Sequence, residues 1–328
     1  MNEVERIRDL ISSAARFLVV SHIRPDGDAI GSLLGLGCAL QAAGKHVQMV
    51  DADGVPLSLR YLESSNQVRN SPEGAFDLII VVDCSDLRRT GNTLNGYKLP
   101  DINIDHHATN ELFAQINLVD SKAVSTTEII YDHLDAWGLP LTKDVSDALL
   151  MGLITDTIGF RTPNVTPKAL RIAANLMEAG SDLANLYQQA LINRSYEAIR
   201  FWGAGLSVLE RRGPVIWTTL TMDDRKAAGY GGRDDADLIN LLSSINDVEI
   251  CVVFIEQPNE HVKVSWRSQP GIDVSRVASG FGGGGHPSAA GAEITGDLEQ
   301  VRSLVLQETF RLINNDHKEY YLNGMKNE

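Results

Sequence analysis

Four short segments of the chain place histidines and aspartates at or just beyond the ends of apolar runs. They are His22-Ile-Arg-Pro-Asp26-Gly-Asp28, Asp83, Asp105-His106-His107 and Asp156. Imidazoles combined with several carboxylates suit hard divalent metals of the manganese type. Two such ions held close together activate water and stabilise charge on a phosphoryl group. These residue types and spacings therefore point to two-metal hydrolysis of a phosphate ester.

Each segment also has an ordinary structural explanation. An isolated Asp-Gly-Asp sequence more often forms an Asx-turn and a helix N-cap, which is the alternative for Asp26 and Asp28. Asp83 ends a strongly apolar strand, where an ionised side chain needs a partner unless it lies at the sheet rim. Asp156 is also compatible with a helix-end cap. The combination of all four segments favours the metal site over these alternatives.

The elements that carry these residues alternate between strand and helix in the first half of the chain. The sequence predicts a strand over Phe17–His22, a helix over Ala29–Ala43, and strands over Val47–Asp51, Phe76–Asp83 and Asp101–Asp105. This βαβ order indicates an α/β fold with a parallel sheet. The chemistry-bearing residues then fall at the carboxyl ends of strands, where open α/β sheets bind their ligands.

Helices and a second α/β unit complete the predicted organisation. Helices are expected from the capping sequence Ser125-Thr-Thr-Glu128 to Trp137, over Lys143–Ile158 and over Thr166–Gly180. In the second unit we expect strands over Val215–Thr221, Glu249–Glu256 and His261–Arg267, and helices over Asp237–Ile245 and Leu298–Asn314. The predicted domains are residues 1–185, a helical connector over 186–206, and a smaller α/β domain over 207–328.

Composition limits the cellular setting and the partners. Cys38, Cys84 and Cys251 are odd in number and widely spaced, so we interpret them as reduced packing residues. No apolar run approaches the ~20 residues of a membrane span, and the acidic, amphipathic start is unlike a secretory signal. We therefore expect a cytoplasmic protein with no membrane partner. The formal net charge of −14 argues against binding long nucleic acid, but a cleft with a few arginines still suits a small phosphorylated ligand.

The four segments resemble the motifs of the DHH phosphoesterase family. In the second half, Ser265-Trp-Arg-Ser268 and Phe281-Gly-Gly-Gly-Gly-His-Pro-Ser-Ala-Ala-Gly291 resemble the DHH-associated domain of the NrnA-like nanoRNase branch. The resemblance covers nearly the whole chain. It implies a DHH metal-binding domain followed by a substrate-binding domain.

The resemblance also implies a role for each site residue. One manganese ion would be held by His22, Asp26 and Asp83, and the other by Asp28, Asp83, His106 and Asp156, so that Asp83 bridges them. His107 would contact the scissile phosphate and, with Asp83, form the catalytic centre. The rest of the substrate would be bound by Arg267, Ser268, Gly283, Gly284, Gly285 and His286. Successive glycines suit an anion-binding nest of backbone N–H groups. Arg161 is a further candidate because it follows Asp156 closely.

The implied activity is hydrolysis of very short RNA, two to about five nucleotides, and of linear dinucleotides such as pGpG and pApA, to nucleoside 5′-monophosphates. One alternative is a phosphatase acting on 3′-phosphoadenosine 5′-phosphate. Another is a nucleotide-binding regulator, although a pure binder needs no complete set of metal ligands. Oligomeric state, including a homodimer, is left open by the sequence.

Overall fold

A computed structural model describes the backbone of residues 2–324 and the side chains of residues 2–313. The chain divides into two compact units, Met1–Asn193 and Arg194–Glu328. The finer division expected from the sequence, with a connector over residues 186–206, stays a prediction. No helix within the described residues is both long enough and apolar enough to cross a bilayer.

The first unit is built on a five-stranded sheet in which every neighbouring pair is parallel. Its order is β2-β1-β3-β4-β5. The strands are β1 (Arg16–Val20), β2 (His46–Val50), β3 (Leu78–Val82), β4 (Ile102–Asp105) and β5 (Ile116–Val119). The predicted α/β class is confirmed, although β5 had not been predicted. The order reverses between β1 and β3, and such a reversal opens a crevice at the carboxyl ends of the strands.

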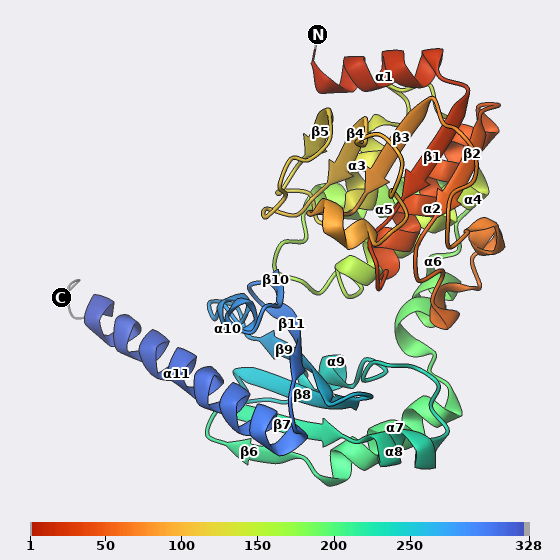
Figure 1. The fold of residues 1–328 in the computed structure, drawn as a ribbon. Coiled ribbons are helices and arrows are strands. Elements are labelled where there is room, and N and C mark those ends of the chain that lie inside the picture. The colour runs from red at the N-terminus through yellow and green to blue at the C-terminus, as the bar shows by residue number, and fades with distance from the viewer. Residues whose placement is uncertain (1, 325–328) are drawn as a thin grey trace. The chain divides into compact units, whose positions relative to one another are not determined.

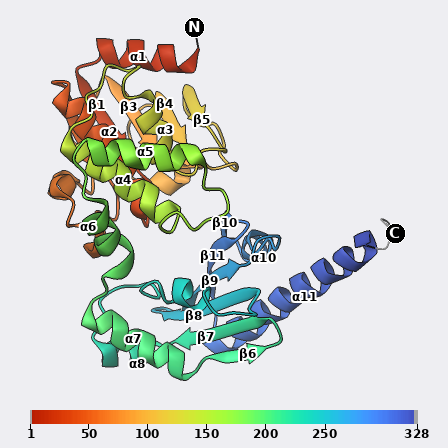
Figure 2. The same ribbon diagram turned by 180° about the vertical axis from the view of Figure 1, so that it is seen from behind.

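Helices cover one face of this sheet, and irregular segments cover the other. The helices are α1 (Glu3–Ser13), α2 (Gly27–Ala42), α3 (Thr126–His133), α4 (Lys143–Asp156) and α5 (Pro167–Glu178). The strands lie in front of α2 to α5 in Figure 1, and α4 and α5 lie in front of the sheet in Figure 2. In β3, Ile80 packs with the helices, whereas Ile79 and Val81 pack toward Leu94 and Phe113. This two-sided burial explains the continuous apolar run of that strand.

The chain leaves the first unit through short helical pieces. These are α6 (Leu183–Tyr187), a π-helical turn over Gln188–Ile192, and α7 (Tyr196–Ser207), which belongs to the second unit. Ser195 begins α7 by accepting a hydrogen bond from the Ala198 N–H. The helical character expected here is present, but it is broken at residues 193–195.

The second unit is a mixed sheet of order β10-β11-β9-β8-β7-β6. Its strands are β6 (Glu210–Arg212), β7 (Val215–Leu220), β8 (Ile250–Gln257), β9 (His261–Ser268), β10 (Gly284–His286) and β11 (Ala289–Thr295). Its helices after α7 are α8 (Met222–Ala228), α9 (Leu238–Leu242), α10 (Ser275–Gly280) and α11 (Leu298–Gly324). One sheet face packs on α7, α8 and α9, and the other on α10 and α11. Strands β6, β10 and β11 had not been predicted, and α11 continues past its expected end near Asn314.

Candidate metal centre

His22 lies just beyond the end of β1 and is almost fully buried. Its Nδ1 atom is 2.9 Å from the Ile23 carbonyl oxygen. A carbonyl accepts but does not donate, so Nδ1 carries the proton and the Nε2 lone pair is left for a ligand. Nε2 lies 3.5 Å from Asp83 Oδ2 and 3.9 Å from Asp26 Oδ1. The backbone therefore fixes the tautomer that a metal-binding imidazole needs.

Asp83 stands at the middle of the cluster. It follows β3 directly, is buried, and has a φ of +52°. This left-handed conformation is unfavourable for a residue other than glycine and is concentrated at functional sites. Oδ2 faces His22, whereas Oδ1 lies 3.8 Å from His106 Nε2 and accepts the Thr126 hydroxyl at 2.9 Å. The two oxygens thus face different imidazoles, which is the geometry of a bridging carboxylate.

His106 brings a second group of carboxylates together. Its Nδ1 lies 3.4 Å from the Ala123 carbonyl oxygen, so Nε2 is again left for a ligand. Nε2 faces one oxygen from each of three aspartates: Asp28 Oδ2 at 4.0 Å, Asp83 Oδ1 at 3.8 Å and Asp156 Oδ2 at 3.6 Å. Asp156 is the last residue of α4, and Asp28 lies in the first turn of α2.

Among the groups of three ligand atoms that are compact enough to hold a metal ion, two consist entirely of residues that the sequence nominated as metal ligands. They are His22, Asp26 and Asp83, and Asp28, Asp83 and His106, with the ligand atoms of each set within 4.8 Å of one another. Asp83 belongs to both sets. The cluster therefore unites every residue that the sequence nominated as a metal ligand, with Asp156 beside the second set through His106.

Asp28 is oriented by the amino end of α3. Its Oδ2 accepts the Thr126 N–H at 2.6 Å, and its Oδ1 accepts the Thr127 N–H at 3.1 Å and the Thr127 hydroxyl at 2.8 Å. Helix N-termini present free N–H groups that suit an anion. The sequence interpretation of this segment as a capping box missed this role. The box itself is incomplete, because the Glu128 carboxylate accepts the Val124 N–H instead of that of the N-cap residue.

Asp26 is placed to serve in both roles that the sequence suggested for it, as a helix N-cap and as a metal ligand. Its Oδ1 accepts the Ala29 N–H at 3.0 Å, so it is the N-cap of α2, and the same oxygen faces His22. The helix begins at Gly27, earlier than expected. A helix cap and a metal ligand are compatible here because a carboxylate has lone pairs for both.

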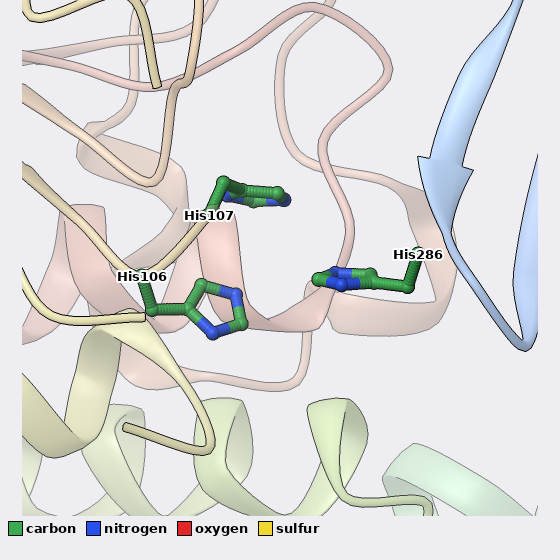
Figure 3. Close-up of side chains that lie close together, drawn as sticks. All are labelled: His106, His107 and His286. Atoms are coloured by element: carbon green, nitrogen blue, oxygen red, sulfur yellow. The ribbon is translucent and has the colours of Figure 1, made fainter. Parts of the chain in front are cut away.

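His107 is oriented by the last residue of β4. Its Nδ1 lies 2.7 Å from Asp105 Oδ1, so this nitrogen donates to a buried carboxylate. Asp105 also accepts the His106 N–H at 2.9 Å and the Asn110 amide at 2.6 Å. Figure 3 shows the His106 and His107 rings close to each other, and their centroids are 4.7 Å apart with an interplanar angle of 65°. Asp105 therefore fixes the orientation of the His107 ring.

The electrostatics of the cluster fit bound cations. Burial, followed by the charge of Asp83, raises the pKa of Asp28 to about 7, and burial together with the charge of Asp28 raises the pKa of Asp156 well above its ordinary value. Burial, the largest single influence, opposes charge on His22, but the hydrogen bond with Asp83 and the negative charges of Asp26 and Asp83 together outweigh it and raise the pKa of His22. Buried carboxylates that repel one another are stabilised by a divalent cation. The donor set and its charge therefore fit divalent metal ions.

Arg161 is the further candidate for substrate binding that the sequence offered. It is exposed after α4, and its backbone N–H donates to the Thr157 carbonyl. Its side chain makes no hydrogen bond or ion pair with the residues that the structure describes. Its expected role in substrate binding stays a prediction.

The substrate-binding residues expected in the second half lie in the second unit. Arg267, on β9, donates from Nη1 to the Trp266 carbonyl, and its buried Nε has no partner among the described residues. Ser268 donates its hydroxyl to the Ile272 carbonyl at 2.6 Å, so this hydroxyl is engaged in holding a loop. The position of these residues relative to the metal cluster stays a prediction.

The glycine run forms an edge strand where the sequence suggested a nest. Gly284–His286 is β10, paired antiparallel with β11. A Cβ on Gly283 would lie 2.1 Å from the Gly291 carbonyl oxygen, and one on Gly285 would lie 2.4 Å from that of Ala289. These two glycines are therefore required by close backbone approach. Gly284 has open space around it, and His286 is exposed on the same strand (Figure 3).

Comparisons with known proteins agree with this geometry. Residues 16–153 match the DHH family, N-terminal domain, and residues 224–313 match the DHHA1 domain. A protein of Thermus thermophilus named "Bifunctional oligoribonuclease and PAP phosphatase NrnA" is 37% identical over 295 residues, covering 88% of this chain and 87% of its own. A Bacillus subtilis protein of the same name is 30% identical over 298 residues, covering 88% and 92%. The structure of an exopolyphosphatase-related protein from Bacteroides fragilis has the same fold, with a TM-score of 0.82 at 24% identity and coverage of 97% and 96%.

Proposed function

The chain belongs to the DHH family, and on that premise we propose that it is a phosphodiesterase of very short RNA. Its substrates are oligonucleotides of a few residues and linear dinucleotides such as pGpG and pApA, which it hydrolyses to nucleoside 5′-monophosphates. The observation that carries the proposal is Asp83, whose two oxygens face His22 and His106 at 3.5 and 3.8 Å. The oligoribonuclease names of two relatives support this class of substrate.

The metal ions in this proposal are two manganese ions. Imidazole and carboxylate donors suit manganese. His22, Asp26 and Asp83 would hold one ion, and Asp28, Asp83, His106 and Asp156 would hold the other. When bound, the pair would activate a water molecule for attack on phosphorus and offset charge on the phosphoryl oxygens. The chain contributes ligands whose orientation is already fixed, by Ile23 and Ala123 for the histidines and by Thr126 and Thr127 for Asp28.

His107 is the proposed contact to the phosphoryl group. Burial opposes its positive charge, but the hydrogen bond with Asp105 and the charge of Asp83 outweigh burial and raise the pKa of His107. Because Asp105 occupies Nδ1, the protonated ring directs its Nε2–H outward. A charged donor aimed at a phosphoryl oxygen stabilises the charge that develops there during attack.

A second activity is favoured by the names of the same relatives, which include PAP phosphatase. We propose that the centre also removes the 3′-phosphate of 3′-phosphoadenosine 5′-phosphate. The proposed metal ions and His107 would contact only the phosphoryl group. One centre can therefore hydrolyse both a phosphodiester and a phosphomonoester. The complete ligand set disfavours the alternative of a nucleotide-binding regulator.

The remaining assignments are proposals of the same kind. Arg267, Ser268, Gly283 to Gly285 and His286 would bind the part of the substrate beyond the scissile phosphate, with Arg161 as a further candidate. A cytoplasmic location and a homodimer also belong to the proposal.

Hydrolysis of 5′-labelled RNAs of two to about seven nucleotides, with 3′-phosphoadenosine 5′-phosphate alongside, tests the function. With manganese present we expect dinucleotides to be cleaved fastest and the bisphosphate to be cleaved as well. Cleavage of the bisphosphate alone would reduce the function to that of a phosphatase. Nucleotide binding without any cleavage would overturn the enzyme assignment and favour a regulator.

A further inference from the structure

Arg89 lies on a short 3-10 turn, Leu87–Thr90, that follows Asp83 closely in the chain. Its carbonyl oxygen accepts the Ile23 N–H at 2.6 Å. The next glycine, Gly91, packs on the same loop, because a Cβ there would lie 2.9 Å from Ile23 Cγ2. The turn is therefore fixed against the loop that carries His22.

The Arg89 side chain is partly buried. It makes no hydrogen bond or ion pair with any residue that the structure describes. The carboxylate nearest to it in sequence, Asp86, is already occupied by Arg88, whose Nε lies 3.1 and 2.8 Å from the two Asp86 oxygens. Arg88 is 83% exposed, so the two adjacent arginines have opposite environments.

The positive charge of Arg89 influences two residues of the proposed metal centre and its surroundings. Burial is the largest influence on the pKa of both His22 and Cys84, and in each case the positive charge of Arg89 acts to lower the pKa. Cys84 directly follows Asp83. The guanidinium therefore lies within electrostatic range of the residues around the proposed bridging carboxylate.

We propose that Arg89 binds the phosphate group that is held at the metal centre for hydrolysis. A partly buried cation without a carboxylate partner is stabilised by an anion, and the guanidinium fork matches two phosphate oxygens. In a chain of net charge −14, such a cation also marks where an anionic substrate is accepted. The inference rests on the proposed function for the identity of the anion, a phosphate ester.

Arg89→Gln, Arg89→Lys and the neighbouring Arg88→Gln form the test set. With manganese present, we expect Arg89→Gln to lower kcat/KM by about 10- to 100-fold, the loss of a hydrogen bond to a charged group. The loss should be similar for a dinucleotide and for 3′-phosphoadenosine 5′-phosphate, because both place a phosphoryl group at the centre. Arg89→Lys should restore part of the activity, and Arg88→Gln should behave as wild type.

Binding of inorganic phosphate gives a readout that does not depend on turnover. We expect phosphate to raise the Tm of the manganese-loaded wild type and of Arg88→Gln, and to have much less effect on Arg89→Gln. Equal phosphate shifts in the two glutamine variants, or equal losses of activity, would overturn the assignment. If wild type binds phosphate through Arg89 but cleaves neither substrate, the proposed function fails while the phosphate site stands.

Discussion

Asn110 fixes the carboxylate that orients His107. Its amide nitrogen lies 2.6 Å from Asp105 Oδ2 and 2.8 Å from Asn103 Oδ1, and its own oxygen accepts the Leu112 N–H at 2.7 Å. Every polar atom of the Asn110 side chain is thus engaged. Because Asp105 is fully buried, no solvent molecule replaces a lost donor at low cost. His107 therefore depends on Asn110 for its direction.

Asn110→Ala should lower kcat with little change in KM. A hydrogen bond to a charged group contributes about 1.5–3 kcal/mol, which corresponds to a loss of roughly 10- to 100-fold. Steady-state kinetics on a dinucleotide would measure it. Asn117→Ala is the matched control, since Asn117 holds the same loop through the Leu112 and Ala114 carbonyls without touching Asp105. An equal loss of kcat in the control would show that loop integrity, and not the direction of His107, is responsible.

Asp51 gives the clearest pH dependence of stability. It is buried at the end of β2, where it accepts the Ser21 hydroxyl at 2.6 Å, and burial raises its pKa to about 6. The folded state then binds a proton more tightly than the unfolded state, whose pKa is about 3.9. Ionised Asp51 therefore lowers the free energy of unfolding. This effect is absent below about pH 4, grows as the pH rises, and is complete above about pH 6.

Asp51→Asn should consequently be more stable than wild type by roughly 2–3 kcal/mol above pH 6, and equal to it near pH 4. The amide is isosteric: its oxygen still accepts the Asp53 N–H, which bonds Asp51 Oδ1 at 3.0 Å, and its NH2 group donates to the Ser21 hydroxyl instead of accepting from it. Urea unfolding at several pH values would measure the difference. A difference that does not change between pH 4 and pH 7 would contradict the assigned cause.

The residues proposed as metal ligands could be nominated from the sequence, but the residues that orient them could not. His22, Asp83, His106 and Asp156 stand out because polar groups follow apolar runs. Thr126 binds Asp28 across a separation of 98 residues and Asp83 across 43. No local pattern encodes such a contact, and a threonine at the start of a helix has an ordinary explanation as part of the cap. Arg89 was missed for a similar reason, since only the structure shows that Asp86 is taken by Arg88.

At the scale of elements, close packing of α2 on α4 sets the distance between two helices that carry proposed metal ligands. Asp28 lies on α2 and Asp156 on α4. A Cβ on Gly31 would lie 2.7 Å from the Ala148 carbonyl oxygen and 3.0 Å from backbone atoms of Gly152. These neighbours are backbone atoms, so they cannot move aside by changing rotamer. Glycine is therefore needed at this helix crossing.

Gly31→Ala should destabilise the protein by about 1–3 kcal/mol, the usual effect of overpacking, and weaken manganese binding. Gly203→Ala, in α7, is the control, because a Cβ there meets nothing within 4 Å. That change should stabilise by about 0.5–1 kcal/mol, as alanine does in an open helix position. Thermal unfolding and metal titration would compare the two. Equal stabilisation in both variants would contradict the packing argument.

Elements with long apolar runs or clear helix ends were predictable, and short or glycine-rich ones were not. The run over Phe76–Asp83 gave β3, and Thr166-Pro167 gave the start of α5. Strand β5 has only 4 residues. Strands β10 and β11 consist largely of glycine and alanine at their paired ends, so neither hydrophobic alternation nor β-propensity marked them.

At the scale of the whole molecule, the net charge of −14 argues for a substrate bound through few phosphates. For single-stranded nucleic acid, the slope of log affinity against log salt is about 0.7 per phosphate contacted. We expect a slope of magnitude about 1–2 for kcat/KM on dinucleotides, and no gain in kcat/KM as the RNA is lengthened. A slope of about 5 or more, or faster cleavage of long RNA, would indicate an extended nucleic-acid surface instead.

Titration of the metal-free protein with manganese, while hydrolysis of pApA is followed, tests the two-metal phosphodiesterase most directly. The proposed bridging role of Asp83 predicts that activity appears only as the second equivalent binds, and that Asp83→Asn stays inactive at any manganese concentration used. Full activity with one equivalent, or hydrolysis that persists in the presence of a chelator, would contradict the account.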